Sequence, residues 1–109
     1  MNDAIITELG KILAARRTAD PADSYVASLY QAGREKILCK IGEEAVETVL
    51  AGQAGDNDAI VHEIADLWFH TLILLADAGE EPAAVLAELE RRFGVSGHTE
   101  KAGRTNTHD

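Results

Sequence analysis

Residues 60–75 read IVHEIADLWFHTLILL and place the strongest constraint on the fold, because most of them are apolar. In a helix, which turns about 100° per residue, these apolar side chains cover nearly every face, a pattern typical of a buried helix. Glu63 and Asp66 interrupt the pattern and, three residues apart, share one face. Since an ionised carboxylate is costly to bury, we expect a cationic group to meet this pair.

Four further segments have the apolar spacing or the end signals of helices. The five predicted helices cover about 3–17, 25–31, 34–53, 58–78 and 82–92. Their ends carry the usual capping and terminating residues, namely Ser24, Gly33, Asp56 or Asn57, Gly79 and Pro82. Abundant Ala, Leu, Glu and Ile with only 2 prolines also favour helices over sheets. The sequence predicts an all-α bundle of about five helices, with two long central ones.

The length of 109 residues allows one domain, 1–109, in which we expect 94–109 to be a flexible tail because it lacks apolar periodicity. A domain of this size has a modest core, so we expect a homodimer to complete it.

The net charge of −9 argues against a nucleic-acid partner, which needs clustered Lys and Arg. No apolar run approaches the ~18 residues of a membrane span, so no membrane partner is expected.

Two features favour a cytoplasmic protein. Cys39 is the single cysteine, so no internal disulfide can form, as is usual in a reducing compartment. The first residues, MNDAIITELGK, carry acids where a secretion signal needs basic residues. We expect Cys39 to be a small apolar core residue.

A second group of carboxylates lies in the predicted helix 34–53. Its segment KIGEEAVE places Glu43, Glu44 and Glu47 within an arc of about 100°, so the three share one face. By itself such a face is usually solvated. The pattern becomes informative if this face packs against the acidic pair of residues 60–75.

A divalent cation would offset the charge of the two acidic faces if they pack together. The lysines of helix 34–53 are too few to neutralise all of these carboxylates. An all-oxygen ligand set suits Mg²⁺, or Mn²⁺, whereas a di-iron bundle normally shows Glu-x-x-His pairs. The candidate ligands are Glu44, Glu47, Glu63 and Asp66. The alternative is that Arg or Lys from helix 3–17 or from the tail pairs with these acids, and no metal site exists.

The histidines and aromatic residues of 60–75 have simpler interpretations. His70 lies four residues after Asp66 and can orient its carboxylate, contact a substrate or ligate a metal, but a core histidine bonded to the neighbouring acid is favoured. His62 lies off the face of the acidic pair and is given no role. Trp68, Phe69 and Tyr25 are interpreted as core or subunit-interface residues.

The arrangement of carboxylates resembles that of a known superfamily. The order E-E-x-x-E at 43–47, 15 intervening residues and E-x-x-D at 63–66 is similar to the all-α nucleoside triphosphate pyrophosphatases, the MazG-like group. Flanking blocks narrow the resemblance to the phosphoribosyl-ATP pyrophosphatase family. They read SYVASL at 24–29, GREKI at 33–37, ADLWFH at 65–70 and SGHTEKA at 96–102. The resemblance covers about residues 9–104, and departs from the family at Trp68 and Phe69, where leucine and tyrosine are expected.

The resemblance implies a specific reaction and ligand set. The reaction is Mg²⁺-dependent hydrolysis of 1-(5-phosphoribosyl)-ATP to 1-(5-phosphoribosyl)-AMP and pyrophosphate, the second step of histidine biosynthesis, in a cytoplasmic homodimer. Metal binding is carried onto Glu44, Glu47, Glu63 and Asp66, with Glu43 as a neighbouring acid. The zinc-binding cysteines of a fused cyclohydrolase are absent, so we expect a stand-alone protein.

Further residues are candidates for proton transfer and phosphate binding. Glu43 is the candidate to take the proton of an attacking water, since it adjoins the ligands without being one of them. The candidates to bind the phosphates of a nucleotide substrate are Lys36, Lys40, Arg34, Lys101 and Arg104. For the two lysines, a solvated surface is the alternative. One hypothesis is that the tail closes over the substrate and is mobile in its absence.

Two other functions remain open from the sequence. A MazG-like house-cleaning enzyme would use the same carboxylates to hydrolyse ordinary or damaged nucleoside triphosphates. A non-catalytic helical dimer would pair these acids internally and bind partners. A substrate panel distinguishes the first from phosphoribosyl-ATP hydrolysis, and stabilisation by Mg²⁺ distinguishes the second.

Overall fold

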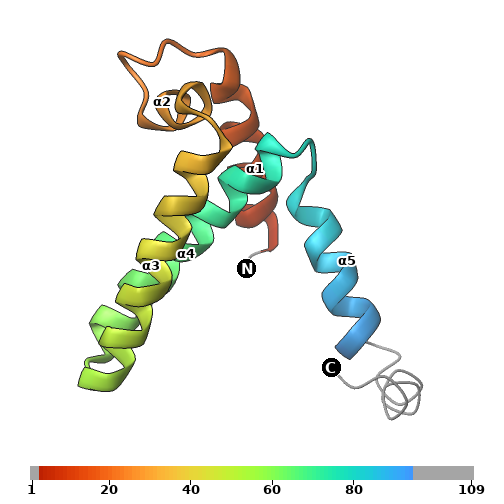
Figure 1. Ribbon diagram of the computed structural model, residues 1–109. Helices are drawn as coiled ribbons and strands as arrows, with labels where there is room; N and C mark the ends of the chain where they lie inside the picture. The colour runs from red at the N-terminus through yellow and green to blue at the C-terminus, as the bar shows by residue number, and fades with distance from the viewer. Residues whose placement is uncertain (1–2, 95–109) are drawn as a thin grey trace.

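A computed structural model describes residues 3–94, which contain helices and no strand. The elements are α1 (Asp3–Ala15), the 3-10 turn η1 (Arg16–Thr18), α2 (Tyr25–Ala32), α3 (Arg34–Ala54), α4 (Asn57–Asp77) and α5 (Pro82–Phe93). Figure 1 shows α3 and α4 as a long hairpin, with α1 and α2 at its upper end and α5 projecting separately. The predicted all-α fold is confirmed, and each predicted helix end lies within 2 residues of an observed one. Of the predicted tail 94–109, residues 95–109 lie outside the described residues.

The hairpin is closed by a turn that its sequence specifies. Gly55 follows α3 with φ at 74°, in the left-handed region that glycine tolerates best, and its N–H donates to the Ala51 carbonyl at 3.1 Å. Asp56 is the N-cap of α4, where its carboxylate accepts a hydrogen bond from the Ala59 N–H at 3.2 Å. Two adjacent residues therefore reverse the chain and cap both helices.

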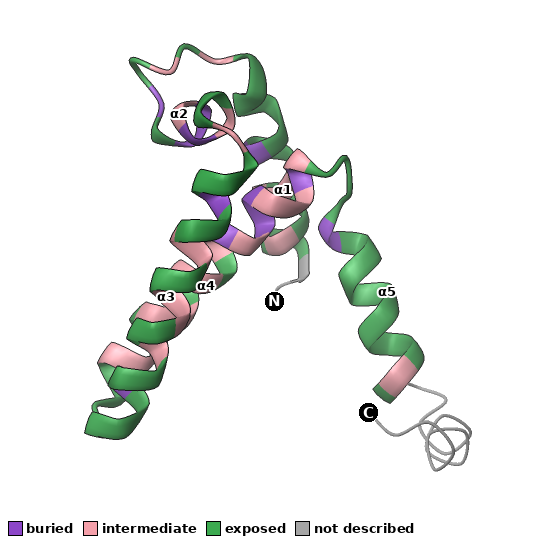
Figure 2. Cartoon of the chain, viewed as in Figure 1, coloured by how far each residue is buried: buried purple, intermediate pink, exposed green. Residues whose placement is uncertain are grey.

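The hydrophobic core lies at the upper end of the hairpin, where α1 and α2 cover α3 and α4. Leu13, Ile37 and Ile73 are fully buried there, one each from α1, α3 and α4. Leu29 of α2 belongs to the same cluster. Figure 2 shows the buried positions grouped mainly at this end, while the lower half of the hairpin mixes intermediate and exposed positions and α5 is largely exposed. The core therefore holds the hairpin from one end.

Polar contacts tie the C-terminal end of α4 to the elements around it. Arg17 donates to the Ala76 carbonyl at 2.8 Å, and its guanidinium lies over the Tyr30 ring. Arg34 forms an ion pair with Asp77 at 2.8 Å. A cation near the last turn of a helix also interacts favourably with the helix dipole. These contacts orient the upper end of the hairpin relative to α1 and α2.

The last helix, α5, joins the bundle mainly through its first residue. Pro82 is buried against Gly10 of α1, where an added Cβ would lie 2.6 Å from the proline ring. Farther along α5, Glu88 forms ion pairs with Arg91 at 2.7 Å and Arg92 at 2.9 Å. These pairs lower the pKa of Glu88 to about 2. Local charge pairs therefore support a helix that few tertiary contacts cover.

The prediction that the helix over residues 60–75 is buried on nearly every face is wrong for the single chain. Val61 of α4 is 69% exposed and Trp68 is 59% exposed. The reason is geometric, because α4 packs against α3 and α1 and the described part of the chain has too few elements to cover its remaining surface. Four exposed apolar residues of α3 and these two residues of α4 together form what we call the exposed apolar set: Leu38, Val46, Val49, Leu50, Val61 and Trp68.

Several single-residue interpretations are corrected by the same geometry. For Tyr25 and Trp68, which are 50% and 59% exposed, the core alternative is wrong and the subunit-interface alternative stays a prediction, whereas Phe69 packs against the core. Cys39 is exposed instead of filling the core. It follows the buried Ile37 by two residues, about 200° around the helix, so burial of one exposes the other.

By length and composition alone, α4 is long and apolar enough to cross a membrane. The core helix of a soluble protein has the same properties. Here α4 packs against α3 and α1 and carries two carboxylates in its central turns, which are costly in a lipid environment. Its contacts within the described chain leave much of its apolar surface exposed.

We predict that Ile73→Ala lowers the free energy of unfolding by about 2–5 kcal/mol, because it leaves a cavity at a fully buried position. The control Ile5→Ala removes the same atoms from a side chain that is 65% exposed, and should change stability by about 0.5 kcal/mol or less. Urea unfolding followed by circular dichroism measures both variants. Equal losses would contradict the core described above.

Candidate metal centre

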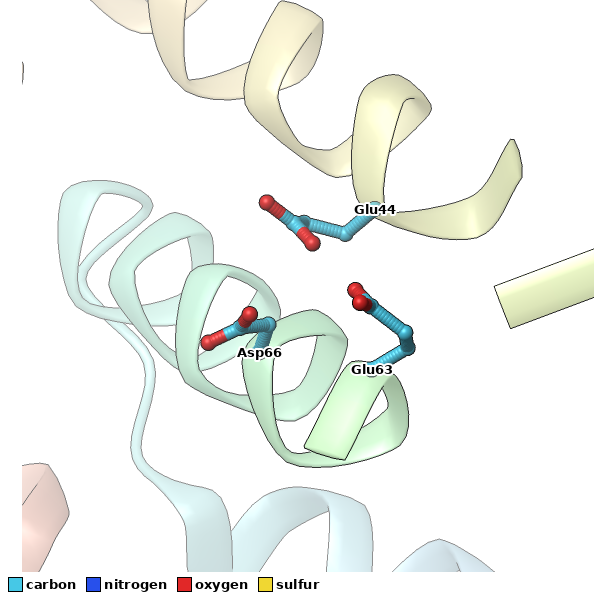
Figure 3. A group of neighbouring side chains, drawn as sticks. All are labelled: Glu44, Glu63 and Asp66. Atoms are coloured by element: carbon cyan, nitrogen blue, oxygen red, sulfur yellow. The ribbon is translucent and has the colours of Figure 1, made fainter. Parts of the chain in front are cut away.

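Carboxylates from both long helices meet halfway along the hairpin. Glu44 and Asp66 are each 11 residues from Gly55 at the turn, so equal helical rise places them level on α3 and α4. Glu63 lies one turn before Asp66 on the same face of α4. Figure 3 shows the three side chains pointing toward one another across the gap between the helices. One carboxylate oxygen from each lies within 4.8 Å of the others. We call these three residues the carboxylate cluster.

The carboxylate cluster has a donor set and a spacing that fit Mg²⁺. With Mg–O distances of about 2.1 Å, neighbouring ligand oxygens of an octahedral ion lie about 3 Å apart and opposite ones about 4.2 Å apart. The upper limit of 4.8 Å on the spacing of the cluster oxygens is close to the distance between opposite ligands. All of the donors are carboxylate oxygens, which hard divalent cations prefer. Glu44, Glu63 and Asp66 are therefore suited to hold this ion.

Repulsion within the cluster acts on Glu63. Its pKa is raised above the ordinary value, first by desolvation and then by the charge of Glu44, a hydrogen bond with Glu44 and the charge of Glu47. The charge of His62 opposes this shift. The raised pKa means that folding disfavours the ionised form of Glu63. The metal-free protein therefore loses stability as the pH rises from the pKa of Glu63 in the unfolded chain to its higher pKa in the folded protein. A bound cation would reverse this effect by favouring the ionised carboxylates.

A histidine, not a lysine or arginine, forms the ion pair that reaches the cluster. His62 lies 3.4 Å from a carboxylate oxygen of Asp66, and within α1 to α4 no Lys or Arg forms an ion pair with the cluster. The alternative in which helix 3–17 neutralises these acids is therefore not observed. The sequence interpretation gave His62 no role, and this was wrong because residues four apart meet on a helix surface.

The other two predicted carboxylates lie beside the cluster. Glu47, one turn after Glu44, is exposed, and its charge contributes to the raised pKa of Glu63. Glu43 is also exposed and accepts a hydrogen bond from the Lys40 ammonium at 3.3 Å. The structure thus brings three of the four candidate ligands together and leaves the fourth next to them. Metal binding by the full set stays a prediction.

His70 is a buried histidine, as favoured from the sequence, but its partner differs. The residue is 5% exposed, and its Nδ1 lies 2.9 Å from the backbone carbonyl oxygen of Asp66, not from the carboxylate. Its Nε2 lies 2.9 Å from the Tyr25 hydroxyl. The i, i+4 spacing fits either partner, because a helix carbonyl can accept a second hydrogen bond from the side chain four residues later. The Asp66 carboxylate is therefore left to the cluster.

The candidate phosphate-binding residues lie in different surroundings. Lys40 is beside the cluster, one turn before Glu44. Arg34 is engaged in the ion pair at the end of α4 described above. Lys36 is exposed, one turn before Lys40. Lys101 and Arg104 lie outside the described residues. Lys40 is therefore the candidate that the structure places nearest the carboxylates along α3.

Comparisons with known proteins agree with this arrangement. A family model described as phosphoribosyl-ATP pyrophosphohydrolase matches residues 6–93, which include the whole hairpin and its carboxylates. A curated protein of Hydrogenovibrio crunogenus, named phosphoribosyl-ATP pyrophosphatase, is 53% identical over 109 residues, and the alignment covers 96% of each chain. On a match of this extent and identity, the chain belongs to the phosphoribosyl-ATP pyrophosphohydrolase family.

Proposed function

We propose that this protein hydrolyses 1-(5-phosphoribosyl)-ATP to 1-(5-phosphoribosyl)-AMP and pyrophosphate with Mg²⁺, in the cytoplasm, as the second step of histidine biosynthesis. The observation that carries the proposal is the carboxylate cluster on the hairpin of a chain from this family. The relative from Hydrogenovibrio crunogenus bears the corresponding name. Hydrolysis of a triphosphate commonly uses a divalent cation, and the cluster offers one its ligands.

The carboxylate cluster would hold the cation between the two helices, and Glu47 would add a fourth ligand by turning toward it. When bound, Mg²⁺ offsets charge on the triphosphate and polarises the attacking water. The ligands sit on two packed helices, so little rearrangement is needed to assemble them. Mn²⁺ accepts the same oxygen donors.

Lys40 and Glu43 would act on the phosphate and on the water. The Lys40 ammonium donates to the Glu43 carboxylate at 3.3 Å. A substrate phosphate carries more charge than a carboxylate, so its arrival would draw the ammonium away and release Glu43. The released carboxylate would then accept the proton of the attacking water. The remaining phosphate contacts are assigned to Lys36, Arg34, Lys101 and Arg104.

We also propose that two copies form a homodimer through the exposed apolar set. Large apolar side chains exposed along both helices of the hairpin mark an interaction surface. A groove between α4 and α5 adds to it and is lined by Trp68, Leu86 and Leu89 among others. A second copy would cover the apolar surface that the single chain of 109 residues leaves open.

The first prediction of this proposal concerns pyrophosphate release from phosphoribosyl-ATP. We expect Mg²⁺-dependent release by the wild type, and a loss of about 100-fold or more in Asp66→Asn, since removal of a ligand should exceed the 10–100-fold typical of outer-shell changes. Parallel assays with ATP, dUTP and the other common nucleoside triphosphates test the substrate.

Each outcome of this assay has a definite meaning. Release from other triphosphates instead of phosphoribosyl-ATP would assign the protein to the house-cleaning enzymes and retain the metal centre. Release without added metal in the presence of a chelator would contradict the role of Mg²⁺. No release from any triphosphate would support the non-catalytic dimer.

Metal binding should also be visible without any substrate. At a Mg²⁺ concentration ten times its Kd, linkage predicts about 1.4 kcal/mol of added stability, a rise of roughly 5–10 °C in Tm for a domain of this size. Asp66→Asn should show much less of this rise, because the cluster loses a charged ligand. Thermal unfolding with and without Mg²⁺ measures the difference, and an equal rise in both proteins would place the bound metal elsewhere.

The homodimer is tested by charge insertion into the exposed apolar set. Val49→Asp, at a side chain that is 60% exposed in the single chain, should shift the protein from dimer to monomer, because the new charge would be buried at the interface. Sedimentation equilibrium measures the change. Gln31→Asp inserts the same charge at an exposed position of α2 and should leave the dimer intact. A monomeric wild type would contradict the proposal.

A further inference from the structure

His70 is a buried polar residue to which the proposed reaction gives no part. It is 5% exposed, and the other buried polar residue among those described is Ser24, which caps α2. Its Nδ1 bonds to the Asp66 backbone carbonyl and its Nε2 to the Tyr25 hydroxyl, both at 2.9 Å. The side chain therefore connects α2 to the turn of α4 that carries Asp66, a member of the carboxylate cluster. We call Tyr25 and His70 together the polar link.

Chemistry and packing hold the polar link in one arrangement. A backbone carbonyl can only accept, so the proton of the neutral imidazole lies on Nδ1 and is donated to Asp66. Nε2 is then an acceptor, and the Tyr25 hydroxyl donates to it. The Tyr25 and Phe69 rings each meet the His70 ring edge-on, with centroids 5.9 Å and 5.3 Å away. The imidazole is thus fixed in both tautomer and orientation.

The polar link meets α4 between the core and the carboxylate cluster. His70 follows Asp66 by four residues and precedes the fully buried Ile73 by three, so it lies about one turn from each. It is also the first buried residue of α4, because positions 57–69 are all intermediate or exposed. Burial therefore fixes α4 only from His70 onward, and Asp66 lies on the less covered side of that point.

The other end of the polar link is anchored to α3 through α2. Tyr25 is the first residue of α2, and the preceding Ser24 accepts a hydrogen bond from the Ala27 N–H at 3.1 Å. The next residue, Val26, is buried in the hydrophobic cluster that also contains Ile37 of α3. Since α2 packs against α3, the link gives α3 and α4 a second connection besides their direct contact.

This second connection acts on the turn of α4 that supplies a candidate ligand. Asp66 lies level with Glu44, and their like charges repel when no cation lies between them. The hydrogen bond from His70 restrains the Asp66 carbonyl, and with it the backbone from which the carboxylate projects. Ligands that are held in place before a metal arrives cost less free energy to assemble around it.

We infer that Tyr25 and His70 are positioning residues, which hold the Asp66 turn of α4 opposite Glu44 and thereby raise the affinity of the carboxylate cluster for a divalent cation. The inference rests on the proposed function for cation binding by the cluster, and not for the identity of the substrate. It gives the buried His70 a task distinct from ligating the metal. It also explains why a half-exposed tyrosine is bonded to a buried histidine on a different helix.

Binding of Mn²⁺ to the metal-free protein, with no substrate present, tests the inference. Electron paramagnetic resonance measures the free Mn²⁺ during a titration, and competition with Mg²⁺ gives the affinity for that ion. We expect Tyr25→Phe to weaken the binding of both ions about tenfold, at the lower end of the roughly 10–100-fold typical of changes around metal ligands. Wild-type affinity in Tyr25→Phe would overturn the inference.

The second tyrosine of the chain provides a matched control. Tyr30 also lies on α2, and its hydroxyl donates to the Leu13 carbonyl at 2.8 Å, so Tyr30→Phe removes a comparable hydrogen bond. We expect Tyr30→Phe to lower Tm while leaving the Kd for Mn²⁺ within about twofold of wild type. Circular dichroism at the temperature of the titration confirms that both variants are folded. Equal weakening in the two variants would assign the effect to a general loss of stability and refute the positioning role.

A double-mutant cycle tests whether Tyr25 acts through His70. Asn can still donate to the Asp66 carbonyl but is too short to reach Tyr25, so His70→Asn breaks the link at the same hydrogen bond as Tyr25→Phe. The two single variants should therefore weaken Mn²⁺ binding by similar factors. Adding Tyr25→Phe to His70→Asn should cost less than about a further twofold. Losses that multiply in the double variant would contradict the inference.

Asp66→Asn shows where the metal is bound. This variant keeps the backbone carbonyl that His70 contacts and removes the carboxylate, so Mn²⁺ binding should weaken by about 100-fold or more. Absence of Mn²⁺ binding by the wild type, or binding that Asp66→Asn leaves unchanged, would overturn the inference.

Pyrophosphate release from phosphoribosyl-ATP, measured on the same proteins, separates the inference from the proposed function. If Tyr25→Phe weakens Mn²⁺ binding as expected while the wild type releases no pyrophosphate, the proposed function fails and the inference stands. If the wild type releases pyrophosphate while Tyr25→Phe binds Mn²⁺ as tightly as the wild type, the proposed function stands and the inference fails.

Discussion

The packing of α3 against α4 is the interaction on which the rest of this structure depends. The turn at Gly55 and Asp56 sets the register of the two helices, and that register brings Glu44 level with Asp66. Desolvation first, and then the neighbouring charges of Glu44 and Glu47, raise the pKa of Glu63, so bringing these carboxylates together disfavours their ionised forms. Apolar burial at the upper end of the hairpin, around Ile37 and Ile73, therefore holds together a site whose own charges repel.

Separation of the core from the carboxylates has a consequence for the shape of the protein. Most of the buried residues lie at one end of the hairpin, and the residues of its central and lower turns are mostly intermediate or exposed. The same arrangement exposes apolar residues such as Val49 and Val61. A chain that used these positions for its own core would need further helices. The proposed second copy would supply such cover without lengthening the chain.

The second link in the structure is polar and connects α2 to α4 through His70. A buried imidazole is costly unless both nitrogens are bonded, and here the Asp66 carbonyl and the Tyr25 hydroxyl satisfy them. The bond to the carbonyl leaves the Asp66 carboxylate available to the cluster. This link therefore joins α2 to the turn of α4 that contains Asp66.

The sequence by itself determined the helices, their ends and the acids that share a face of each helix, because capping residues such as Ser24 and Asp56 and helical spacing act locally. The contact between His62 and Asp66 also follows from local spacing, because the two residues are four positions apart on one helix. Only the tertiary structure decided which apolar face is covered, and it left Cys39 exposed where a core position was expected and excluded the core alternative for Trp68. It also decided that His70 bonds to Tyr25, 45 residues away. The physical reason is that periodicity gives the direction of a side chain from its own helix, whereas burial and long-range hydrogen bonds depend on which other elements lie in that direction.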